Sequence, residues 1–377
     1  MKKKIAIVLD VKKYDWNGGI NYYNNLINFF DIKKYQLFVI IGKKTIIDKK
    51  QFNKKFKFIK LGICDPFTIN WLIRKIIYKI FNKDFLLLNF FTKEKFDFLT
   101  HSVSLGDQKE IKVVNWIPDL QPFLLKKNFL KSEISKHYNQ FYNYYKFSYK
   151  LIFSSKTESK KFFKIFKVKD KSKIYIFNNL PNIIKKKNIN SLDNITSKFK
   201  LKKNYFFVPN QFWKHKNHIC LLKAIKLLKK KKIQFVFAGN LSDYRNIDHL
   251  NFLKKFIYNN NIEKYVKILG NIAYHDVVNL IIHSKGLINP SNYEGWSTSV
   301  EEAKLYDIPI ILSGIDTHKE QIKTSNLFFK KNNHNDLKNK ILRCMKLRKK
   351  KFNYLKIKKY HITRSKIMKS KVNEIYK

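Results

Sequence analysis

The chain has 377 residues, enough for two domains with separate cores, and its hydrophobic (44%) and aromatic (16%) fractions argue against disorder. Lys and Arg number 79 against 27 Asp and Glu, a net charge of +52 that is typical of proteins with nucleic-acid or anionic-membrane partners. The excess is nearly all Lys and accompanies frequent Ile, Asn, Phe and Tyr, which resembles the codon bias of an AT-rich genome. A solvated lysine coat is therefore favoured, and attraction to an anionic membrane surface is the second interpretation.

The cysteines and the first residues indicate where the protein works. Cys64, Cys220 and Cys344 form no C-x-x-C pair, so neither a disulfide framework nor a zinc site is indicated, and a reducing cytoplasm fits. Asp10 and Lys12 interrupt the N-terminal apolar run before a signal peptide could be complete, and no apolar run approaches the length of a membrane span. We expect a cytoplasmic protein that could lie peripherally on the inner membrane.

Short apolar runs alternate with helical patterns, as in a parallel sheet covered by helices. Strands are predicted in the first half at 4–10, 36–42, 55–62, 113–119, 151–155 and 173–179, and in the second half at 204–210, 233–240, 266–271, 285–291 and 308–314. The predicted fold class is α/β, with two Rossmann-like doubly wound domains that face a central cleft.

The domain boundaries follow from composition. The first domain is expected over residues 1–185, and a polar, proline-led linker without periodicity over 186–200. The second domain is expected over 201–350. A helical tail over 351–377 could pack back on the first domain.

Ligands of doubly wound sheets lie beyond the carboxyl ends of strands, near helix N-termini, which selects three loops. In the first, Gly18 and Gly19 precede a helix expected to begin near Ile20, and their amides could approach an anion, although an ordinary turn explains them equally well. In the second, "VPNQFWKHKNH", a lysine after the strand could neutralise a phosphate. His215 and His218 in that loop are better explained by capping or solvation than by metal binding.

The third loop, "NYEGWSTSVEEA", places Glu294 before a predicted helix and Glu302 within it. Thr298 with Glu301 and Ser299 with Glu302 both fit a capping box, which would explain the helix carboxylates without any function. A capping box does not explain Glu294. Two carboxylates on either side of helix N-terminal amides offer acceptors for hydroxyls and donors for a diphosphate, which suits a nucleotide sugar.

At these residues the chain resembles family 4 glycosyltransferases, the bacterial "group 1" enzymes of the GT-B fold. Their E-x(7)-E signature after "PS" is matched by Pro290, Ser291, Glu294 and Glu302, and "NQFWKHKNH" and "WIPDLQ" (116–121) resemble other family segments in the same order. The resemblance implies a hexosyltransferase-type enzyme that moves a sugar from a nucleotide diphosphate sugar to a glycan or lipid-linked acceptor with retention of configuration. It also implies that the first domain binds the acceptor and that the second binds the nucleotide sugar. Envelope polysaccharide or lipopolysaccharide biosynthesis would be its pathway.

The resemblance also implies the roles of single residues. Catalytic roles would fall to Glu294 on the donor sugar, to Lys216 on the diphosphate and to Asp119. Glu302 would hold the ribose, and further donor contacts would come from Gly295, Ser297, Thr298, Ser299, Gln211, Lys214, Gly18 and Gly19. No cofactor is implied, and because no D-x-D triplet is present, no metal is expected.

Two positions depart from the family pattern, and two other functions stay open. Gln211 stands where arginine is usual, with Lys214 as a candidate replacement for that cation, and Asp307 stands where a glycine usually precedes a strand. The alternatives are a nucleotide-sugar epimerase of the same fold and a basic protein that binds nucleic acid or an anionic membrane. No aromatic RNA motif, zinc pattern or helix-turn-helix supports a nucleic-acid partner.

Overall fold

The structure is a computed structural model that describes residues 2–11, 17–231, 233–323, 327–348 and 352–377. Its contacts divide the chain into two compact units. Unit 1 comprises Met1–Leu180 together with Arg364–Lys377, and unit 2 comprises Pro181–Thr363.

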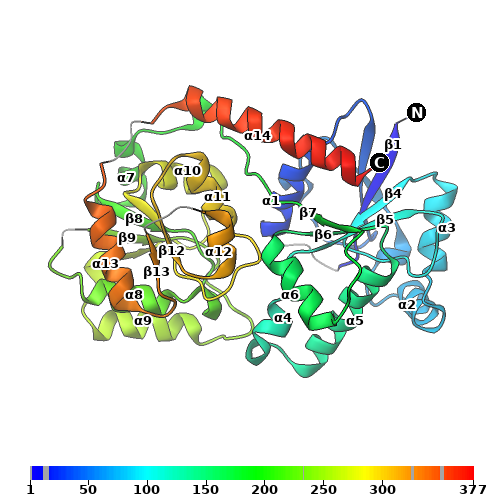
Figure 1. Cartoon of the computed structure of the whole chain (residues 1–377), viewed down its shortest axis with the longest axis horizontal. Coiled ribbons are helices and arrows are strands. Elements are labelled where there is room, and N and C mark those ends of the chain that lie inside the picture. The colour runs from blue at the N-terminus through cyan, green and yellow to red at the C-terminus, as the bar shows by residue number, and fades with distance from the viewer. Residues whose placement is uncertain (1, 12–16, 232, 324–326, 349–351) are drawn as a thin grey trace. The chain divides into compact units, whose positions relative to one another are not determined.

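Unit 1 is built on a parallel sheet whose strand order is β3-β2-β1-β4-β5-β6-β7 within the described residues (Figure 1). The strands are β1 (Lys3–Leu9), β2 (Tyr35–Ile41), β3 (Phe56–Lys60), β4 (Phe98–His101), β5 (Lys112–Ile117), β6 (Lys150–Phe153) and β7 (Ile174–Ile176). The helices are α1 (Asn17–Leu26), α2 (Ile69–Phe81), α3 (Phe85–Lys93), α4 (Gln121–Leu124), α5 (Lys131–Phe147) and α6 (Lys156–Phe166).

The central strand β1 shows why this sequence forms a two-faced sheet. Its residues are apolar almost without interruption because helices cover both faces of a parallel sheet. Ile5 and Ile7 enter a core that contains residues of α1, whereas Ala6 and Val8 enter a separate core with residues of α3. The alternation follows the two-residue period of a strand.

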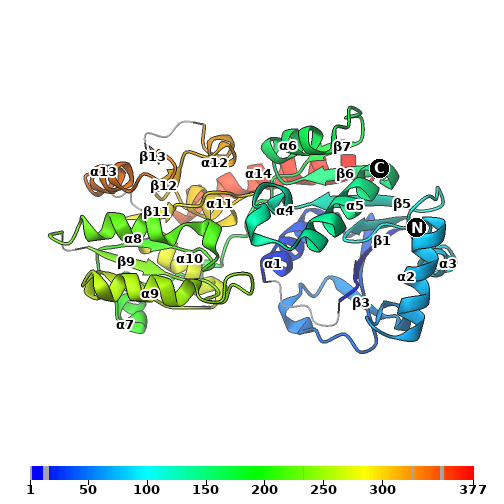
Figure 2. The ribbon, with the colours of Figure 1, turned by 90° about the horizontal axis from the view of Figure 1, so that it is seen from below.

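Unit 2 carries a second parallel sheet, of strand order β10-β9-β8-β11-β12-β13 in the described ranges (Figure 2). Its strands are β8 (Tyr205–Val208), β9 (Gln234–Phe237), β10 (Val266–Ile268), β11 (Gly286–Asn289), β12 (Ile310–Ser313) and β13 (Phe328–Phe329). Its helices are α7 (Leu192–Phe199), α8 (His218–Lys226), α9 (His249–Asn259), α10 (Tyr274–His283), α11 (Thr298–Leu305), α12 (Asp316–Gln321) and α13 (His334–Met345).

The segment expected as a linker, 186–200, belongs to unit 2 and contains α7. Ser191 caps this helix by accepting from the backbone N–H of Asn194, and Ile195 is fully buried in the core of the unit. A helix of eight residues has too short an apolar stripe to stand out from its polar neighbours.

The last helix, α14 (Tyr354–Ile375), contributes to both units. In unit 2, Ile357 packs with Ile184. In unit 1, Met368 and Val372 of the helix, together with Tyr376 just beyond it, are buried in the core that covers one face of the sheet. Among the described residues, no helix has both the length and the apolar character that crossing a membrane requires.

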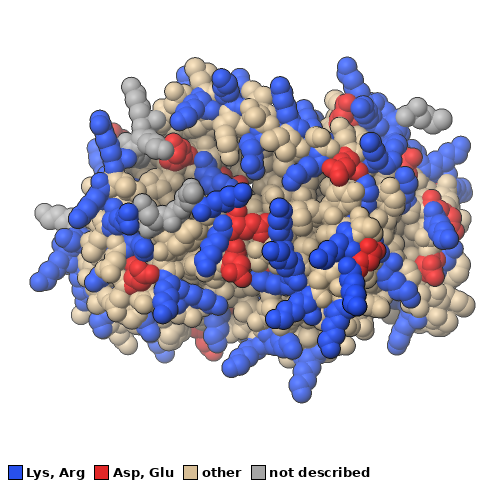
Figure 3. All heavy atoms as spheres, in the orientation of Figure 1, with Lys and Arg blue, Asp and Glu red and all other residues tan. Residues whose placement is uncertain are grey.

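The predicted α/β class with two doubly wound domains is confirmed, and every predicted strand is present. The strand β4 and the two-residue β13 were not predicted. Lys and Arg side chains are spread over the visible face instead of gathering at one place (Figure 3).

Candidate functional site

Two of the candidate loops emerge side by side in unit 2. They follow β8 and β11, which are neighbours in the sheet. The strand order reverses between them, because β9 and β10 extend the sheet from β8 whereas β12 and β13 extend it from β11. Such a switch point creates a crevice beyond the carboxyl ends of the strands, where doubly wound folds bind ligands.

Lys216 and Glu294 form an ion pair at this edge. Lys216 ends a short 3-10 helix, Lys214–Lys216, and its Nζ lies 2.8 Å from Glu294 Oε2 and 2.9 Å from Oε1. The two side chains are only 14% and 7% exposed. The backbone N–H of Asn292 donates to His215 O at 2.8 Å and joins the two loops. The structure thus brings together the expected phosphate cation and the expected sugar carboxylate.

Glu294 is held ionised by its surroundings. Ser291 Oγ donates to Glu294 Oε1 at 2.7 Å, and Asn289 Nδ2 donates to it at 3.2 Å. Burial raises the pKa of Glu294, but the Lys216 ammonium, the nearby His318 and the Ser291 hydroxyl outweigh burial and lower this pKa to about 2. At neutral pH Glu294 is therefore a charged hydrogen-bond acceptor.

Two asparagines that were not predicted organise these loops. Asn289, the last residue of β11, is fully buried and donates to Ser297 Oγ as well as to Glu294. Asn210, just beyond β8, donates to Asn289 Oδ1 at 3.1 Å, so the bond links the two strand ends. An amide side chain at the end of an apolar strand, as in "LIN", is a signal that sequence reading could have used.

Glu302 is buried on α11, and its surroundings differ from those of Glu294. Its carboxyl is hydrogen-bonded to the side chain of Tyr274, the first residue of α10. Burial raises the pKa of Glu302 to about 7, and the bond to Tyr274 offsets only part of that rise. The expected ribose ligand therefore changes charge near neutral pH.

The start of α11 corrects the capping-box expectation. The helix begins at Thr298, so Ser297 is its N-cap, and neither Thr298 nor Ser299 occupies a capping position. In this described stretch the Ser297 side chain caps no helix N–H but contacts Ser299 Oγ at 3.2 Å. Glu301 pairs with Lys304 Nζ at 2.9 Å. The carboxylates of this helix are therefore not explained by capping.

The backbone amides of Ser297, Thr298 and Ser299, which were expected to donate to the nucleotide sugar, do not all have a hydrogen-bond partner among the described residues. Ser297 N–H donates to Gln321 Oε1 at 3.3 Å. Thr298 and Ser299 provide the first two amides of α11, which have no partner within a helix and point beyond its N-terminus. Gly295 is buried in the loop between Glu294 and the helix.

The loop after β8 corrects a second expectation. His215 and His218 are buried instead of solvated, and burial lowers the pKa of each to about 3, so both rings are neutral. His218 stacks on Phe212 with ring centroids 4.5 Å apart. Gln211 is half-buried, and Lys214 is exposed.

Buried polar atoms without a partner occur in these two loops and in α12. Within the described parts of the chain, Gln211 Oε1, both ring nitrogens of His215, Trp296 Nε1 and His318 Nε2 have no hydrogen-bond partner. Such atoms are rare in folded proteins and mark places where a ligand or water completes the bonding. No group of three His, Cys, Asp or Glu side chains in the described ranges is placed to hold a metal ion.

The remaining predicted residues lie in unit 1. Asp119 follows β5, and its oxygens accept from Gln121 N–H at 3.0 Å and Gln121 Nε2 at 2.9 Å. Gly18 and Gly19 lie in the first turn of α1, which begins at Asn17 and not near Ile20 as expected. First-turn amides lack intrahelical partners, so the helix can begin at the glycines without using their donors.

His101, at the end of β4, was also not predicted. Its backbone φ of 75° is in the left-handed region, which is uncommon for a residue with a side chain. Its Nε2 lies 3.0 Å from Tyr22 Oη, and its Nδ1 lies 2.7 Å from Thr100 Oγ1. A strained histidine beside β1, where the strand order of unit 1 reverses, fits a functional edge of this sheet.

Comparisons with known proteins give the family. Residues 163–360, just over half of the chain, match the family model described as "Glycosyl transferases group 1". The chain belongs to this family. Among curated proteins it is similar to the capsular polysaccharide biosynthesis glycosyltransferase CapH of Staphylococcus aureus, with 29% identity over 136 residues. That match covers 34% of this chain and only 36% of CapH.

Solved structures share the fold over the whole chain. A glycosyltransferase from Rickettsia africae has a TM-score of 0.72 at 17% identity, covering 100% of this chain and 98% of that one. The Anabaena protein Alr3699/HepE, in complex with UDP and glucose, has a TM-score of 0.66 at 13% identity, covering 99% and 97%. The expected family and GT-B fold are confirmed, and the roles of single residues stay predictions.

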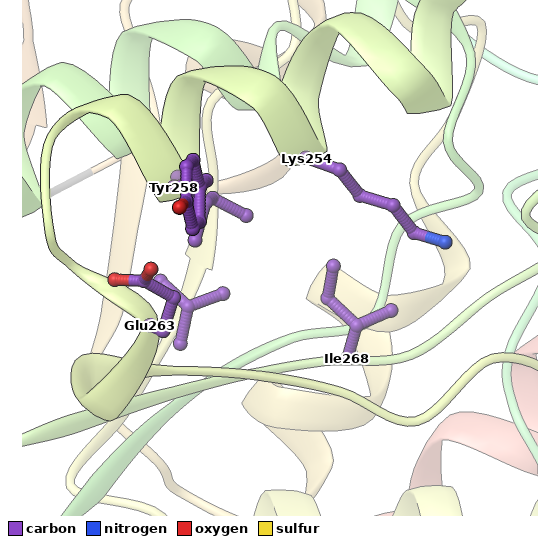
Figure 4. Close-up of a pocket in the computed structure, with 6 residues that line it drawn as sticks. Lys254, Tyr258, Glu263 and Ile268 are labelled. Atoms are coloured by element: carbon purple, nitrogen blue, oxygen red, sulfur yellow. The ribbon is translucent and has the colours of Figure 1, made fainter.

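A pocket of about 300 Å³ lies elsewhere in this group 1 chain (Figure 4). It is formed by α9 and the segment around β10, the edge strand of the second sheet, and is lined by Lys254, Ile257, Tyr258, Glu263, Val266 and Ile268. None of the predicted site residues is among them. The candidate site in the loops after β8 and β11 is therefore separate from this pocket.

Proposed function

We propose that this protein transfers a sugar from a nucleotide diphosphate sugar to a glycan or lipid-linked acceptor, with retention of configuration. The observation that carries the proposal is the buried Lys216–Glu294 pair beyond β8 and β11, in a chain of the group 1 family. An ammonium suited to a diphosphate and a carboxylate suited to sugar hydroxyls stand within one hydrogen bond of each other. Buried polar atoms without a partner lie on the same two loops, at Gln211, His215 and Trp296, which supports a ligand site there.

The donor would replace the contact between these two side chains. Its diphosphate would take over the Lys216 ammonium, helped by the first amides of α11 at Thr298 and Ser299. Glu294, freed from the ammonium but still bonded to Ser291, would accept from hydroxyls of the sugar. Glu302 would accept from the ribose. In the free protein the pair neutralises both groups, which lowers the cost of burying them until the donor arrives.

The chemical step needs charge stabilisation more than a strong base. The bond between the anomeric carbon and the diphosphate oxygen breaks, and the acceptor oxygen bonds to the same face of that carbon. The acceptor proton passes to the departing phosphate. Lys216 and the helix amides stabilise the negative charge that develops there, a role in which preorganised groups are most effective. We propose that this replaces a metal ion.

The other predicted residues would complete the site. Gln211 and Lys214 lie on the loop that carries Lys216, where Lys214 would supply the second phosphate cation. Gly18 and Gly19 of α1 and Asp119 after β5 would act from unit 1, toward the donor phosphates and the acceptor. We propose a cytoplasmic role in envelope glycan synthesis, as the name of CapH suggests for that relative.

The test combines donors and variants. The protein is incubated with several nucleotide sugars, and free nucleotide, epimerised donor and transferred sugar are followed separately. Glu294→Gln should lose most turnover and retain affinity for the nucleoside diphosphate, whereas Glu302→Gln should weaken that affinity by about 1.5 to 3 kcal/mol. Glu301→Gln, on the same helix, is the matched control and should keep turnover. Epimerised donor without nucleotide release would instead identify an epimerase, and full turnover of Glu294→Gln would contradict the assigned site.

A further inference from the structure

Helix α2 presents an apolar face to solvent. Five side chains form this face, and each is between 45% and 75% exposed: Ile69, Leu72, Ile73, Ile76 and Ile80. They recur at helical spacings of three and four residues and so form one stripe about 100° wide. Such a stripe normally faces a protein core, yet no residue of α2 belongs to a hydrophobic cluster of the described structure.

The opposite side of α2 is polar and buried. Arg74 is only 1% exposed, and its guanidinium pairs with Asp84 at 2.8 Å and with Asp10 at 3.3 Å. Trp71 Nε1 donates to Asp10 at 2.7 Å, and Lys75 Nζ lies 2.6 Å from the same carboxylate. The helix is thus attached to unit 1 through ion pairs. Its polar side faces the protein and its apolar side faces solvent, the reverse of an ordinary surface helix. The attachment fixes the apolar stripe outward.

Exposed aromatic rings extend the apolar face at both ends of α2. Phe67, just before the helix, is 76% exposed, and Phe81, its last residue, is 60% exposed. Phe81 meets the exposed Phe85 of α3 edge to face, with ring centroids 5.8 Å apart. Figures 1 and 2 both show α2 beside α3 on the outside of unit 1.

Exposed lysines lie next to this apolar face, and they would favour an anionic partner. Lys79 is exposed on α2, and Lys43 and Lys44 are exposed on a loop whose amides donate to Asp65, four residues before the helix. Of the carboxylates that contact the segment, Asp65 and Asp84 are buried, and the side chain of Asp10 is 9% exposed. Two exposed carboxylates lie beyond the C-terminal end of α2: Asp107, whose backbone N–H donates to Asn82 O, and Glu110, which is paired with Lys83. The exposed charges next to the helix are thus mainly lysines, and the carboxylates on its inner side are covered.

We infer that this face of α2 docks unit 1 on the surface of an anionic lipid bilayer. Large apolar side chains bordered by lysines are typical of helices that lie in a membrane interface. A protein partner is less favoured, because protein interfaces are depleted in lysine. At 13 residues α2 is too short to span the bilayer. The inference goes beyond the proposed sugar transfer and does not depend on it.

The experiment is co-sedimentation of the full chain with vesicles. Binding to vesicles that contain 30 mol% phosphatidylglycerol should exceed binding to pure phosphatidylcholine at least tenfold. The combined change Ile73→Gln and Ile76→Gln should lower the partition coefficient about tenfold, because it removes two inserted side chains. The melting temperature should not fall, since neither isoleucine is packed in a core.

The matched control is Ile362→Gln with Ile367→Gln on α14, where the two isoleucines are 48% and 50% exposed. This control should change vesicle binding less than twofold. Equal loss in both variants would mean that general surface properties, and not α2, bind lipid, and the inference would be overturned. It would also be overturned if the protein ignored anionic vesicles, or if a lipid-free dimer became monomeric on changing Ile73 and Ile76, which would make the face a contact between copies.

Discussion

The Lys216–Glu294 ion pair predicts how the free energy of unfolding of unit 2 depends on one ammonium. The pKa of Glu294 falls from an ordinary 4.5 to about 2, a difference that corresponds to about 3 kcal/mol. Because the folded state lowers this pKa, the stabilisation is fully present above pH 4.5 and is lost as the pH falls toward 2. Lys216→Ala would leave Glu294 buried without its cation, so it should cost about 3 kcal/mol at pH 7, the lower end of the range for a broken buried ion pair.

A double-mutant cycle measures this value. Urea unfolding of Lys216→Ala, Glu294→Ala and the double variant is followed by hydrogen exchange in the peptides of β8 and β11, which report on unit 2. The double variant should lose little more than either single variant, giving a coupling energy of about 3 kcal/mol at pH 7 that falls to about 1.5 kcal/mol at pH 3, where the folded state still keeps Glu294 mostly ionised. A coupling below about 1 kcal/mol at pH 7 would refute the view that Lys216 holds Glu294 ionised.

Three further predictions concern the site. Lys216→Ala should reduce turnover roughly a hundredfold, or about 3 kcal/mol. The control is Lys226→Ala, at an exposed lysine on α8, which should have almost no effect. Equal losses of turnover would mean that the overall positive charge of the protein, and not Lys216 itself, supports the reaction. Transfer should persist in excess chelator, and a loss restored by manganese or magnesium would contradict metal independence. Burial raises the pKa of Glu302 to about 7, so ionisation of Glu302 destabilises the fold as the pH rises from 4.5 to 7. Glu302→Gln should therefore raise the melting temperature at pH 8 and leave it nearly unchanged at pH 4. The same gain in melting temperature at both pH values would contradict this pKa.

The strands could be predicted because buried parallel strands are uninterrupted apolar runs, as in β1 and β2. The strand β4 could not, because its four residues end in Thr100 and His101. These polar groups are satisfied by Tyr22 and Tyr376, which lie far away in the sequence. Short strands with polar ends carry no periodic signal of their own.

The candidate site was predictable in its parts and not in its arrangement. The motif identified Glu294, and the loop after β8 identified Lys216, but 78 positions separate them and only the pairing of β8 with β11 brings them into contact. At Asp307 the residue type departs from the family pattern, but the backbone conformation does not. The φ of Asp307 is 55°, the left-handed conformation that the usual glycine would adopt there.

Because of helix α14, the order in which the two units can complete their cores differs from the order in which they are synthesised. The strands of unit 1 leave the ribosome first, but Met368, Val372 and Tyr376 complete the core on one face of their sheet. The whole of unit 2 is synthesised between these two parts. Unit 2 can therefore close its core while unit 1 still has an uncovered apolar face, and a nascent chain of this protein would depend on chaperones for its N-terminal half until its last turns of helix emerge.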